Sequence, residues 1–241
     1  MPAIQNDPAT GGDAPLDMSL RLERGGTVSD QVYDALRHAI VTVRVLPGAS
    51  ISENRICRSL GVSRTPVRSA IVRLAEDGLI DVYPQKGSFV APIRLAAIAE
   101  SRFIRRVLEV AVVRDAGAVW NATHSAAARA AIAEQARAIA AGESEAFFRA
   151  DEHFHHIFSL AAGHEGAWAA IVQANSRLGR FHRLFGNKDR LPVVLQEHTG
   201  VIDALDAGEV DRAAHRLEDH IDKVFTLIDH LPEDLRRLVE G

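Results

Sequence analysis

The stretch GVSRTPVRSAIVRLAEDGLI, residues 61–80, holds the signals that end one helix and begin the next. Gly61 suits the position just after a helix, where a left-handed backbone costs a glycine least. Ser63 or Thr65 can cap the following helix, and Pro66 fits its first turn. The apolar face of that helix comprises Val67, Ala70, Ile71 and Leu74. Because Gly78 then ends the second helix, the stretch predicts a helix-turn-helix.

The flanking residues extend this unit on both sides. Upstream, residues 28–43 repeat apolar side chains at helical spacing, and Ser52 can cap a short helix over 53–60. Downstream, the alternating sequence LIDVYPQKGSFVAP, residues 79–92, predicts two short strands around a basic tip. A hairpin in that position is a wing, so residues 27–94 are predicted to form a winged helix-turn-helix domain.

Three basic side chains lie at the tips of this predicted domain. Arg64 and Arg68 begin the second helix of the motif, and Lys86 lies in the wing. Most surface arginines and lysines are only solvated, but three on successive tips favour contact with DNA phosphates and base edges. The charge balance agrees: residues 27–95 carry 9 Lys and Arg against 6 Asp and Glu, whereas 96–241 carry 17 against 22. This asymmetry indicates an anionic partner for the first part only.

The run GVSRTPVRSAIVRLAEDGLI, continued by PQKGSFV, resembles the winged helix-turn-helix of the GntR family, whose usual run is G-V-S-R-T-P-V-R-E-A-L. The resemblance covers about residues 28–92. One departure is Ser69, which stands where Glu is usual, so operator preference cannot be carried over. The resemblance implies that Arg64, Thr65 and Arg68 are contacts of the recognition helix. It also implies that Ser63 contacts a phosphate and that Arg58 is a weaker candidate for such a contact. Lys86 and Gly87 are then residues of the wing.

From residue 95 onward the sequence shows helical patterns only. Glycines and turn sequences divide this part into six predicted helices, over 96–119, 125–141, 143–162, 166–186, 190–207 and 209–230. These patterns predict an all-α antiparallel bundle over 95–241. Residues 1–26 read as a flexible tail. The predicted fold is therefore mainly α, with a winged helix-turn-helix of three helices and a β-hairpin before the helical bundle.

The stretch DEHFHHIF, residues 151–158, concentrates acids and histidines on one predicted helix. At about 100° per residue, Asp151 and His155 share the inward edge with the apolar side chains. Glu152, His153 and His156 fall on the other side of the helix. In two later helices, His198 and His220 also lie on the apolar face. Three helices therefore aim one carboxylate and three imidazoles into the bundle.

A single inward histidine is more often a packed core residue than a ligand. Here three inward histidines occur together, with an aspartate one helical turn from the first of them. This combination favours metal ligands over core packing and predicts a divalent metal site. Imidazole and carboxylate ligands suit zinc first, with nickel or manganese as alternatives. The predicted ligands are Asp151, His155, His198 and His220.

The bundle resembles the FCD effector-binding domain of FadR-type GntR regulators. In its metal-binding members an Asp-x-x-x-His pair is joined by two later histidines about 22 residues apart, the spacing of Asp151, His155, His198 and His220. Six helices rather than seven favour the VanR-like subgroup. Arg105 and Glu109 resemble the family's Arg-x-x-x-Glu, which implies an arginine that binds an effector carboxylate, although the same spacing also fits an ordinary ion pair. Asn175 is expected to point inward and is a weaker candidate than Arg105 for an effector contact.

These observations predict a ligand-responsive transcriptional regulator, with repression as the default. We expect a homodimer that binds a pseudo-palindromic operator and senses a small carboxylate or sugar acid at the metal. A metal-dependent enzyme with an accessory DNA-binding domain is the alternative, but no HExxH run occurs and Glu152 is predicted to face away. A third possibility is a purely structural metal in a dimerisation bundle.

The sequence also gives an expected location. No apolar run approaches the roughly 18–20 residues that span a bilayer. The N-terminus carries acids and glycines where a signal peptide needs a basic end and an apolar core. The single Cys57 excludes an intramolecular disulfide and suits a reducing compartment. We therefore expect a cytoplasmic protein without a membrane partner.

Overall fold

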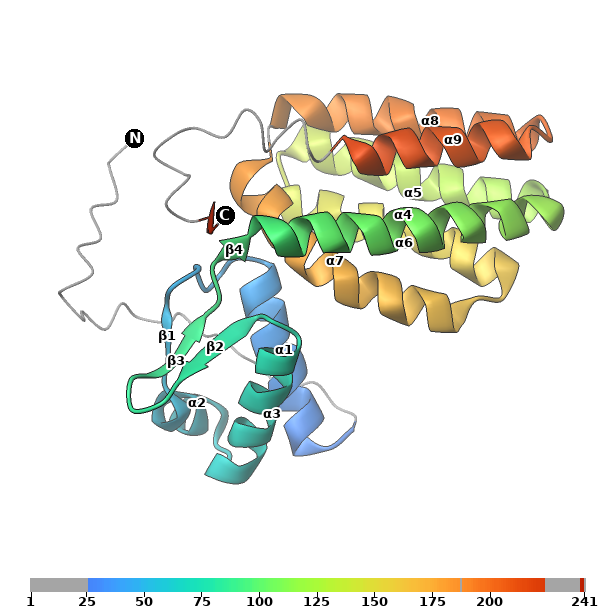
Figure 1. Ribbon diagram of the computed structural model, residues 1–241. Helices are drawn as coiled ribbons and strands as arrows, with labels where there is room; N and C mark the ends of the chain where they lie inside the picture. The colour runs from blue at the N-terminus through green and yellow to red at the C-terminus, as the bar shows by residue number, and fades with distance from the viewer. Residues whose placement is uncertain (1–25, 187, 224–238, 241) are drawn as a thin grey trace. The chain divides into compact units, whose positions relative to one another are not determined.

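The structure is a computed structural model that describes residues 26–186, 188–223 and 239–240 (Figure 1). The described chain divides into two compact units. The first contains residues 26–40 and 44–91, and the second contains 41–43 and the remainder from Pro92. The predicted tail lies outside the described residues except for Gly26, as do residues 224–230 of the last predicted helix.

The first unit has the winged helix-turn-helix architecture that the sequence predicts. Its elements, in chain order, are α1 (Val28–Val41), β1 (Ser50–Ile51), α2 (Glu53–Leu60), α3 (Arg64–Glu76), β2 (Ile80–Tyr83) and β3 (Gly87–Val90). The strands form an antiparallel sheet in the order β1-β3-β2, with Val82 opposite Ser88 and Ile51 also opposite Ser88 on the other side. The hairpin is thus extended by the two-residue strand β1, which sequence reasoning missed.

The helix ends in this unit follow the predicted local signals. Ser52 caps α2, because its side chain accepts a hydrogen bond from the backbone N–H of Arg55 at 3.4 Å. Gly61 ends α2 with φ 66°, the left-handed backbone that glycine adopts without strain. α3 then begins at Arg64 and buries one face completely. The buried side chains of that face are Val67, Ala70, Ile71 and Leu74.

The tip of the wing is a tight turn. The backbone N–H of Lys86 donates to Tyr83 O at 3.2 Å, with Pro84 and Gln85 between them. Gln85 has φ 64°, so the turn has the proline and left-handed residue of a type II turn. Gly87 follows with φ 108°, which a residue with a side chain rarely adopts. The wing therefore presents Lys86 on a turn of defined backbone shape.

The second unit is a bundle of antiparallel helices, as predicted (Figure 1). Its helices are α4 (Leu95–Ala118), α5 (Ala122–Ala141), α6 (Ser144–Ala162), α7 (Glu165–Phe185), α8 (Leu191–Asp206) and α9 (Val210–Asp222). A 3₁₀ turn, η1 (Lys188–Arg190), precedes α8, and the short strands β4 (Ile93–Arg94) and β5 (Val239–Glu240) pair in parallel. α4 packs against α6, α7 and α9, and α8 packs against α5 and α9.

The core of the bundle lies between α4, α5, α6, α8 and α9. Phe154 of α6 is fully buried at its centre and lies edge-on to Phe158, with the ring centroids 5.1 Å apart. Small residues of α5 such as Ala128 and Ala131 face this core and let the helices approach closely. Within the described residues, we find no helix with the length and apolar character needed to cross a membrane. The three helices that carry the inward histidines all border this core.

Candidate functional site

The winged unit presents its predicted DNA-contacting residues to solvent. All seven are exposed: Arg58, Ser63, Arg64, Thr65, Arg68, Lys86 and Gly87. Ser63 stands at the N-cap of α3 but makes no side-chain capping bond. Arg68 forms an ion pair with Glu53 of α2 at 2.9 Å, and 63% of its side chain remains exposed. The N-terminal end of α3 and the wing thus offer hydroxyl, guanidinium and ammonium donors on an open surface.

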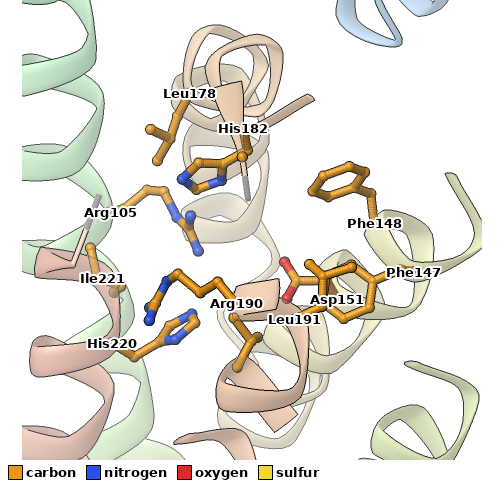
Figure 2. A pocket seen from close by; sticks show the side chains of 12 residues that line it. Arg105, Phe147, Phe148, Asp151, Leu178, His182, Arg190, Leu191, His220 and Ile221 are labelled. Atoms are coloured by element: carbon orange, nitrogen blue, oxygen red, sulfur yellow. The ribbon is translucent and has the colours of Figure 1, made fainter. Parts of the chain in front are cut away.

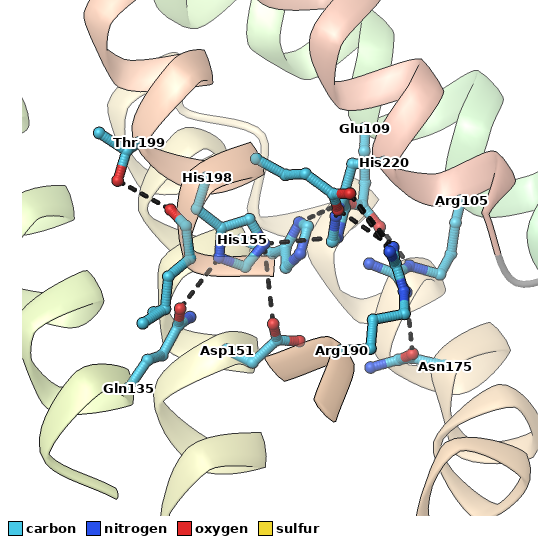
Figure 3. Close-up of polar contacts among 12 residues, drawn as sticks. Arg105, Glu109, Gln135, Asp151, His155, Asn175, Arg190, His198, Thr199 and His220 are labelled. Carbon is cyan, nitrogen blue, oxygen red and sulfur yellow. Dashed lines mark hydrogen bonds and ion pairs between the residues drawn. The ribbon is translucent and has the colours of Figure 1, made fainter. Parts of the chain in front are cut away.

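Three histidines converge inside the bundle (Figure 3). His155 comes from α6, His198 from α8 and His220 from α9. Each offers one ring nitrogen, and the three nitrogens lie within 4.8 Å of one another. His198 Nε2 and His220 Nε2 are only 3.3 Å apart. His155 Nε2 is buried and has no hydrogen-bond partner among the described residues. Nitrogens gathered this closely suit a shared cation.

The other ring nitrogen of each histidine faces an oxygen (Figure 3). His155 Nδ1 lies 2.6 Å from Glu109 Oε2, although the geometry departs from a well-aligned hydrogen bond. His220 Nδ1 lies 2.7 Å from Glu197 Oε2, and His198 Nδ1 lies 3.0 Å from Gln135 Oε1. Metal-bound histidines are usually oriented by such a partner on the nitrogen that does not bind the metal. The polar surroundings of the cluster therefore fit a metal site.

The charge states of the cluster agree with this assignment. Burial, assisted by the neighbouring His220 and His155, holds the pKa of His198 well below its usual range. Burial likewise lowers the pKa of His220, although its hydrogen bond to Glu197 opposes the shift. Both imidazoles are therefore neutral at pH 7, which is the form that binds metals.

Asp151 stands at the edge of the cluster rather than within it. Its Oδ1 lies 3.7 Å from His198 Nε2, while the group of close nitrogens contains the histidines alone. The side chain is partly exposed and also lines the neighbouring pocket. Asp151 thus faces both the histidines and the pocket, as its predicted place on α6 requires.

A pocket of about 80 Å³ opens beside the histidines (Figure 2). Its apolar walls include Phe147, Phe148 and Leu178, and its polar groups are Arg105, Asp151, His182, Arg190 and His220. The two guanidinium groups come from different helical segments and both point into it (Figure 2). A concave apolar site with a few converging charged groups is typical of a small-molecule site. Two guanidinium groups favour an anionic ligand.

The two arginines are held by buried or half-buried carboxylates. Arg105 Nε donates to Glu109 Oε1 at 2.5 Å, and Arg105 Nη1 donates to Asn175 Oδ1 at 3.3 Å. Burial alone would raise the pKa of Glu109, but Arg105 and His155 outweigh it and keep this carboxyl ionised. Arg190 Nη2 donates to Glu197 Oε2 at 3.1 Å. Asn175 is absent from the described lining of the pocket, although it accepts a hydrogen bond from Arg105.

Several neighbours of the site were not identified from the sequence. Arg190 and Glu197 lie two helical turns apart, a spacing that places them on one face, but only the fold shows that Glu197 also contacts His220. His182 lines the pocket, and burial together with Arg105 lowers its pKa to about 3. His156, expected on the outer side of its helix, is half-buried and stacks on Trp168 with ring centroids 4.5 Å apart.

Two family models match the chain. Residues 28–90 match the bacterial regulatory proteins of the gntR family, and residues 100–223 match the FCD domain. An HTH-type transcriptional regulator of Streptomyces ambofaciens is 33% identical over 87% of this chain and 90% of its own length. The HTH-type transcriptional repressor RspR of Escherichia coli is 30% identical over 82% and 87%.

A more distant relative and two solved structures extend the comparison. A protein of Paenarthrobacter nicotinovorans, described as a probable D-xylose utilization operon transcriptional repressor, is 29% identical over 84% of this chain and 89% of its own length. The structure of E. coli McbR/YncC matches with a TM-score of 0.74 at 21% identity, over 85% of this chain and 99% of that one. A GntR transcriptional regulator of Rhodococcus sp. RHA1 matches with a TM-score of 0.72 at 25% identity, over 85% and 99%. The chain therefore belongs to the GntR family of bacterial regulatory proteins, in the FadR-type branch whose winged helix-turn-helix is followed by an FCD domain.

Proposed function

We propose that this GntR-family transcriptional regulator is a repressor that binds a pseudo-palindromic operator as a homodimer and responds to a small carboxylate or sugar acid bound beside a divalent metal. The observation that carries the proposal is the three-histidine cluster adjoining a pocket with two guanidinium groups. RspR and the Paenarthrobacter protein are both described as repressors, which supports repression. The second of these names also supports a sugar-derived effector.

DNA binding through α3 and the wing is supported by the exposed donors of the winged unit. Arg64, Thr65 and Arg68 stand on the solvent side of the first turns of α3, where a recognition helix contacts base edges. Ser63 and Arg58 are placed to contact phosphates, and Lys86 with Gly87 to contact the backbone beside the wing. Substituting Arg64→Ala should weaken operator binding by about 10-fold or more and relax base preference at one position in each half-site.

Fluorescence anisotropy with the protein's operator and with single-base variants measures this change. Arg137→Ala, on α5 of the bundle, is a matched control because its side chain is 70% exposed and it also removes one arginine. Equal operator affinity for Arg64→Ala and Arg137→Ala would remove Arg64 from the recognition surface.

The metal is proposed at His155, His198 and His220, with Asp151 at the edge of the same site. Zinc suits three neutral imidazoles best, while nickel and manganese remain chemically compatible. When bound, a divalent cation supplies a Lewis-acidic position for an effector oxygen. Among the charged side chains that form pairs at the cluster and the pocket, three acids and three bases cancel: Asp151, Glu109 and Glu197, and Arg105, Arg190 and Lys223. A divalent cation adds two positive charges to this balance, which favours an anionic effector.

The metal assignment is tested by changing His198→Ala. The variant should lose stoichiometric metal, because the fully buried His198 supplies one of the three ring nitrogens of the cluster. It should keep operator binding, because the winged unit folds around its own core. Elemental analysis of purified protein measures the metal content, and His153→Ala is the matched control, since His153 is exposed on α6. Stoichiometric metal in His198→Ala would exclude His198 as a ligand.

Homodimerisation is supported by an exposed apolar pair on α4. Phe103 and Val107 are one helical turn apart and are 53% and 49% exposed. Apolar side chains that stand together on a surface helix favour association with another surface. A second copy of this chain is the occupant we propose, because a pseudo-palindromic operator is contacted by two copies of a helix-turn-helix.

A further inference from the structure

Two carboxylates connect the histidine cluster to the pocket. Glu109 uses Oε1 to accept from Arg105 at 2.5 Å and presents Oε2 to His155 Nδ1 at 2.6 Å. Glu197 presents Oε2 both to His220 Nδ1 at 2.7 Å and to Arg190 at 3.1 Å. Each carboxylate is therefore shared between one imidazole of the cluster and one guanidinium of the pocket.

The short contacts decide where the imidazole protons lie. A carboxylate oxygen and an unprotonated ring nitrogen would repel each other at 2.6–2.7 Å, so these two contacts favour the tautomers of His155 and His220 that carry the proton on Nδ1. A neutral imidazole with that proton has its lone pair on Nε2. Each histidine offers one ring nitrogen to a cluster in which these nitrogens lie within 4.8 Å of one another, so the Nε2 lone pairs of His155 and His220 would be available beside His198.

Gln135 holds the third histidine in a different way. Its side-chain amide can turn over, so it can present either an acceptor or a donor to His198 Nδ1. An ionised carboxylate cannot donate, so only Glu109 and Glu197 can fix the tautomer of their histidine. The two carboxylates thus impose a constraint that the amide does not.

We propose that Glu109 and Glu197 are positioning residues that lock His155 and His220 in the metal-binding tautomer and, through the same carboxylates, hold the pocket guanidinium groups of Arg105 and Arg190. This inference rests on the proposed metal-containing pocket and deepens it. Metal affinity and the state of the pocket arginines are then coupled, because both draw on the same two negative charges.

The effect of neutralising either carboxylate follows from its hydrogen bonds. In Glu109→Gln or Glu197→Gln the side chain keeps a single acceptor oxygen, although both the imidazole and the guanidinium need an acceptor. The N–H₂ group of the new amide can instead donate a hydrogen bond to the imidazole. An imidazole that accepts at Nδ1 carries its proton on Nε2, where the metal would bind. We expect zinc affinity to fall by about 10- to 100-fold in each variant, the range found when such orienting partners are removed.

Removing the pocket cation should have the opposite effect. Arg190→Leu leaves Glu197 paired with His220 and with Lys223, whose Nζ lies 2.6 Å from Oε1. The carboxylate then acts more fully on the imidazole, and a positive charge beside the metal is lost. Zinc binding to Arg190→Leu should therefore be severalfold tighter than to the wild type.

The experiment titrates metal-free full-length protein with Zn²⁺ against a chromophoric chelator. Glu145→Gln is the matched control, because Glu145 also pairs with an arginine at 2.5 Å, Arg183, in the same bundle. Circular dichroism checks that each variant is folded. Should Glu109→Gln not fold, Glu197→Gln carries the test, because Arg190 and Lys223 keep 23% and 41% of their side chains exposed.

Nitrogen-15 NMR of the histidine rings in metal-free protein gives a readout that a merely structural role would not change. His155 and His220 should show the Nδ1–H tautomer in the wild type and in Glu145→Gln, and should lose it in the corresponding Gln variant. The inference would be overturned by unchanged zinc affinity in Glu197→Gln and Arg190→Leu, or by Nε2–H tautomers in the wild type. Either result would leave the proposed metal pocket standing. A wild type that binds no zinc would overturn both the inference and the proposed metal pocket.

Discussion

At the scale of single residues, Tyr33 shows how the winged unit is held together by polar contacts beneath its surface. Its hydroxyl donates to Asp77 Oδ2 at 2.5 Å and so joins α1 to the end of α3. The guanidinium of Arg73 lies 4.0 Å from the centre of the same ring and pairs with Asp30 at 2.7 Å. These contacts orient α3 against α1, and therefore the helix that we expect to read DNA.

Burial, followed by the hydrogen bond to Asp77, raises the pKa of Tyr33 to about 12, against about 10 in an unfolded chain. A raised folded pKa contributes stability that is fully present below about pH 10 and is lost as pH rises towards 12. Tyr33→Phe should lower the free energy of unfolding by about 1 kcal/mol at pH 7, a value reduced for partial exposure.

Urea denaturation at several pH values measures this prediction. The difference between wild type and Tyr33→Phe should be constant from pH 7 to 9 and should shrink above pH 10. Tyr83→Phe is the control, since Tyr83 is the other tyrosine of the chain and is exposed in the wing. A difference that grows with pH would contradict the assigned direction of the pKa shift.

At the scale of helices and strands, α4 serves two surfaces at once. One face buries Arg105 and Glu109 inside the bundle, and another exposes Phe103 and Val107. If a second copy covers the exposed face, Phe103→Glu places a charge in an apolar interface and should weaken dimerisation by at least about 10-fold. Sedimentation velocity measures the monomer fraction, and operator binding should lose cooperativity in parallel.

Val193→Glu on α8 is the control for this prediction, because Val193 is also apolar and 41% exposed. A wild type that sediments as a monomer at all tested concentrations would show that the α4 face has another role. Dissociation caused equally by both substitutions would place the interface elsewhere on the bundle.

Helices were more predictable from this sequence than strands. Caps such as Ser52 and Gly61 act locally, so α2 and α3 begin and end where the sequence predicts. β1 and β4 are two residues long, and no periodicity can be recognised over that length. Their pairing depends on partners distant in the chain, which a single sequence does not show.

The candidate site divides in the same way. Helical phase alone brought Asp151, His155, His198 and His220 into consideration, because each shares a face with apolar residues. The residues behind them were not predictable. Glu197 adjoins His198 in sequence, yet it contacts His220 on the next helix, and that contact depends on how α8 and α9 cross.

At the scale of the whole molecule, the distribution of charge controls how the protein meets DNA. The chain is acidic overall, with a formal net charge of −4, while residues 27–95 have a net charge of +3. Long-range attraction is therefore weak, and affinity should come from local phosphate contacts of the winged unit in each copy of the proposed dimer. Each contact releases condensed counterions, so binding should depend steeply on salt.

We expect operator affinity to fall by about 1000-fold or more between 50 and 200 mM salt. Lys86→Ala should make the plot of log affinity against log salt less steep, because it removes one phosphate contact from each copy. Anisotropy titrations over this salt range measure both slopes. An identical slope for wild type and variant would show that Lys86 does not contact the phosphate backbone.

The buried triad of Arg105, Glu109 and His155 has a consequence for how such regulators change over evolution. An ionised carboxylate inside a bundle is tolerated only while both of its partners remain, and loss of one leaves a charge that destabilises the fold. A lineage that loses the proposed metal cannot simply replace His155 alone. Descendants without the metal should have replaced all three residues together, by apolar side chains of similar volume, so that the three positions are inherited as a unit.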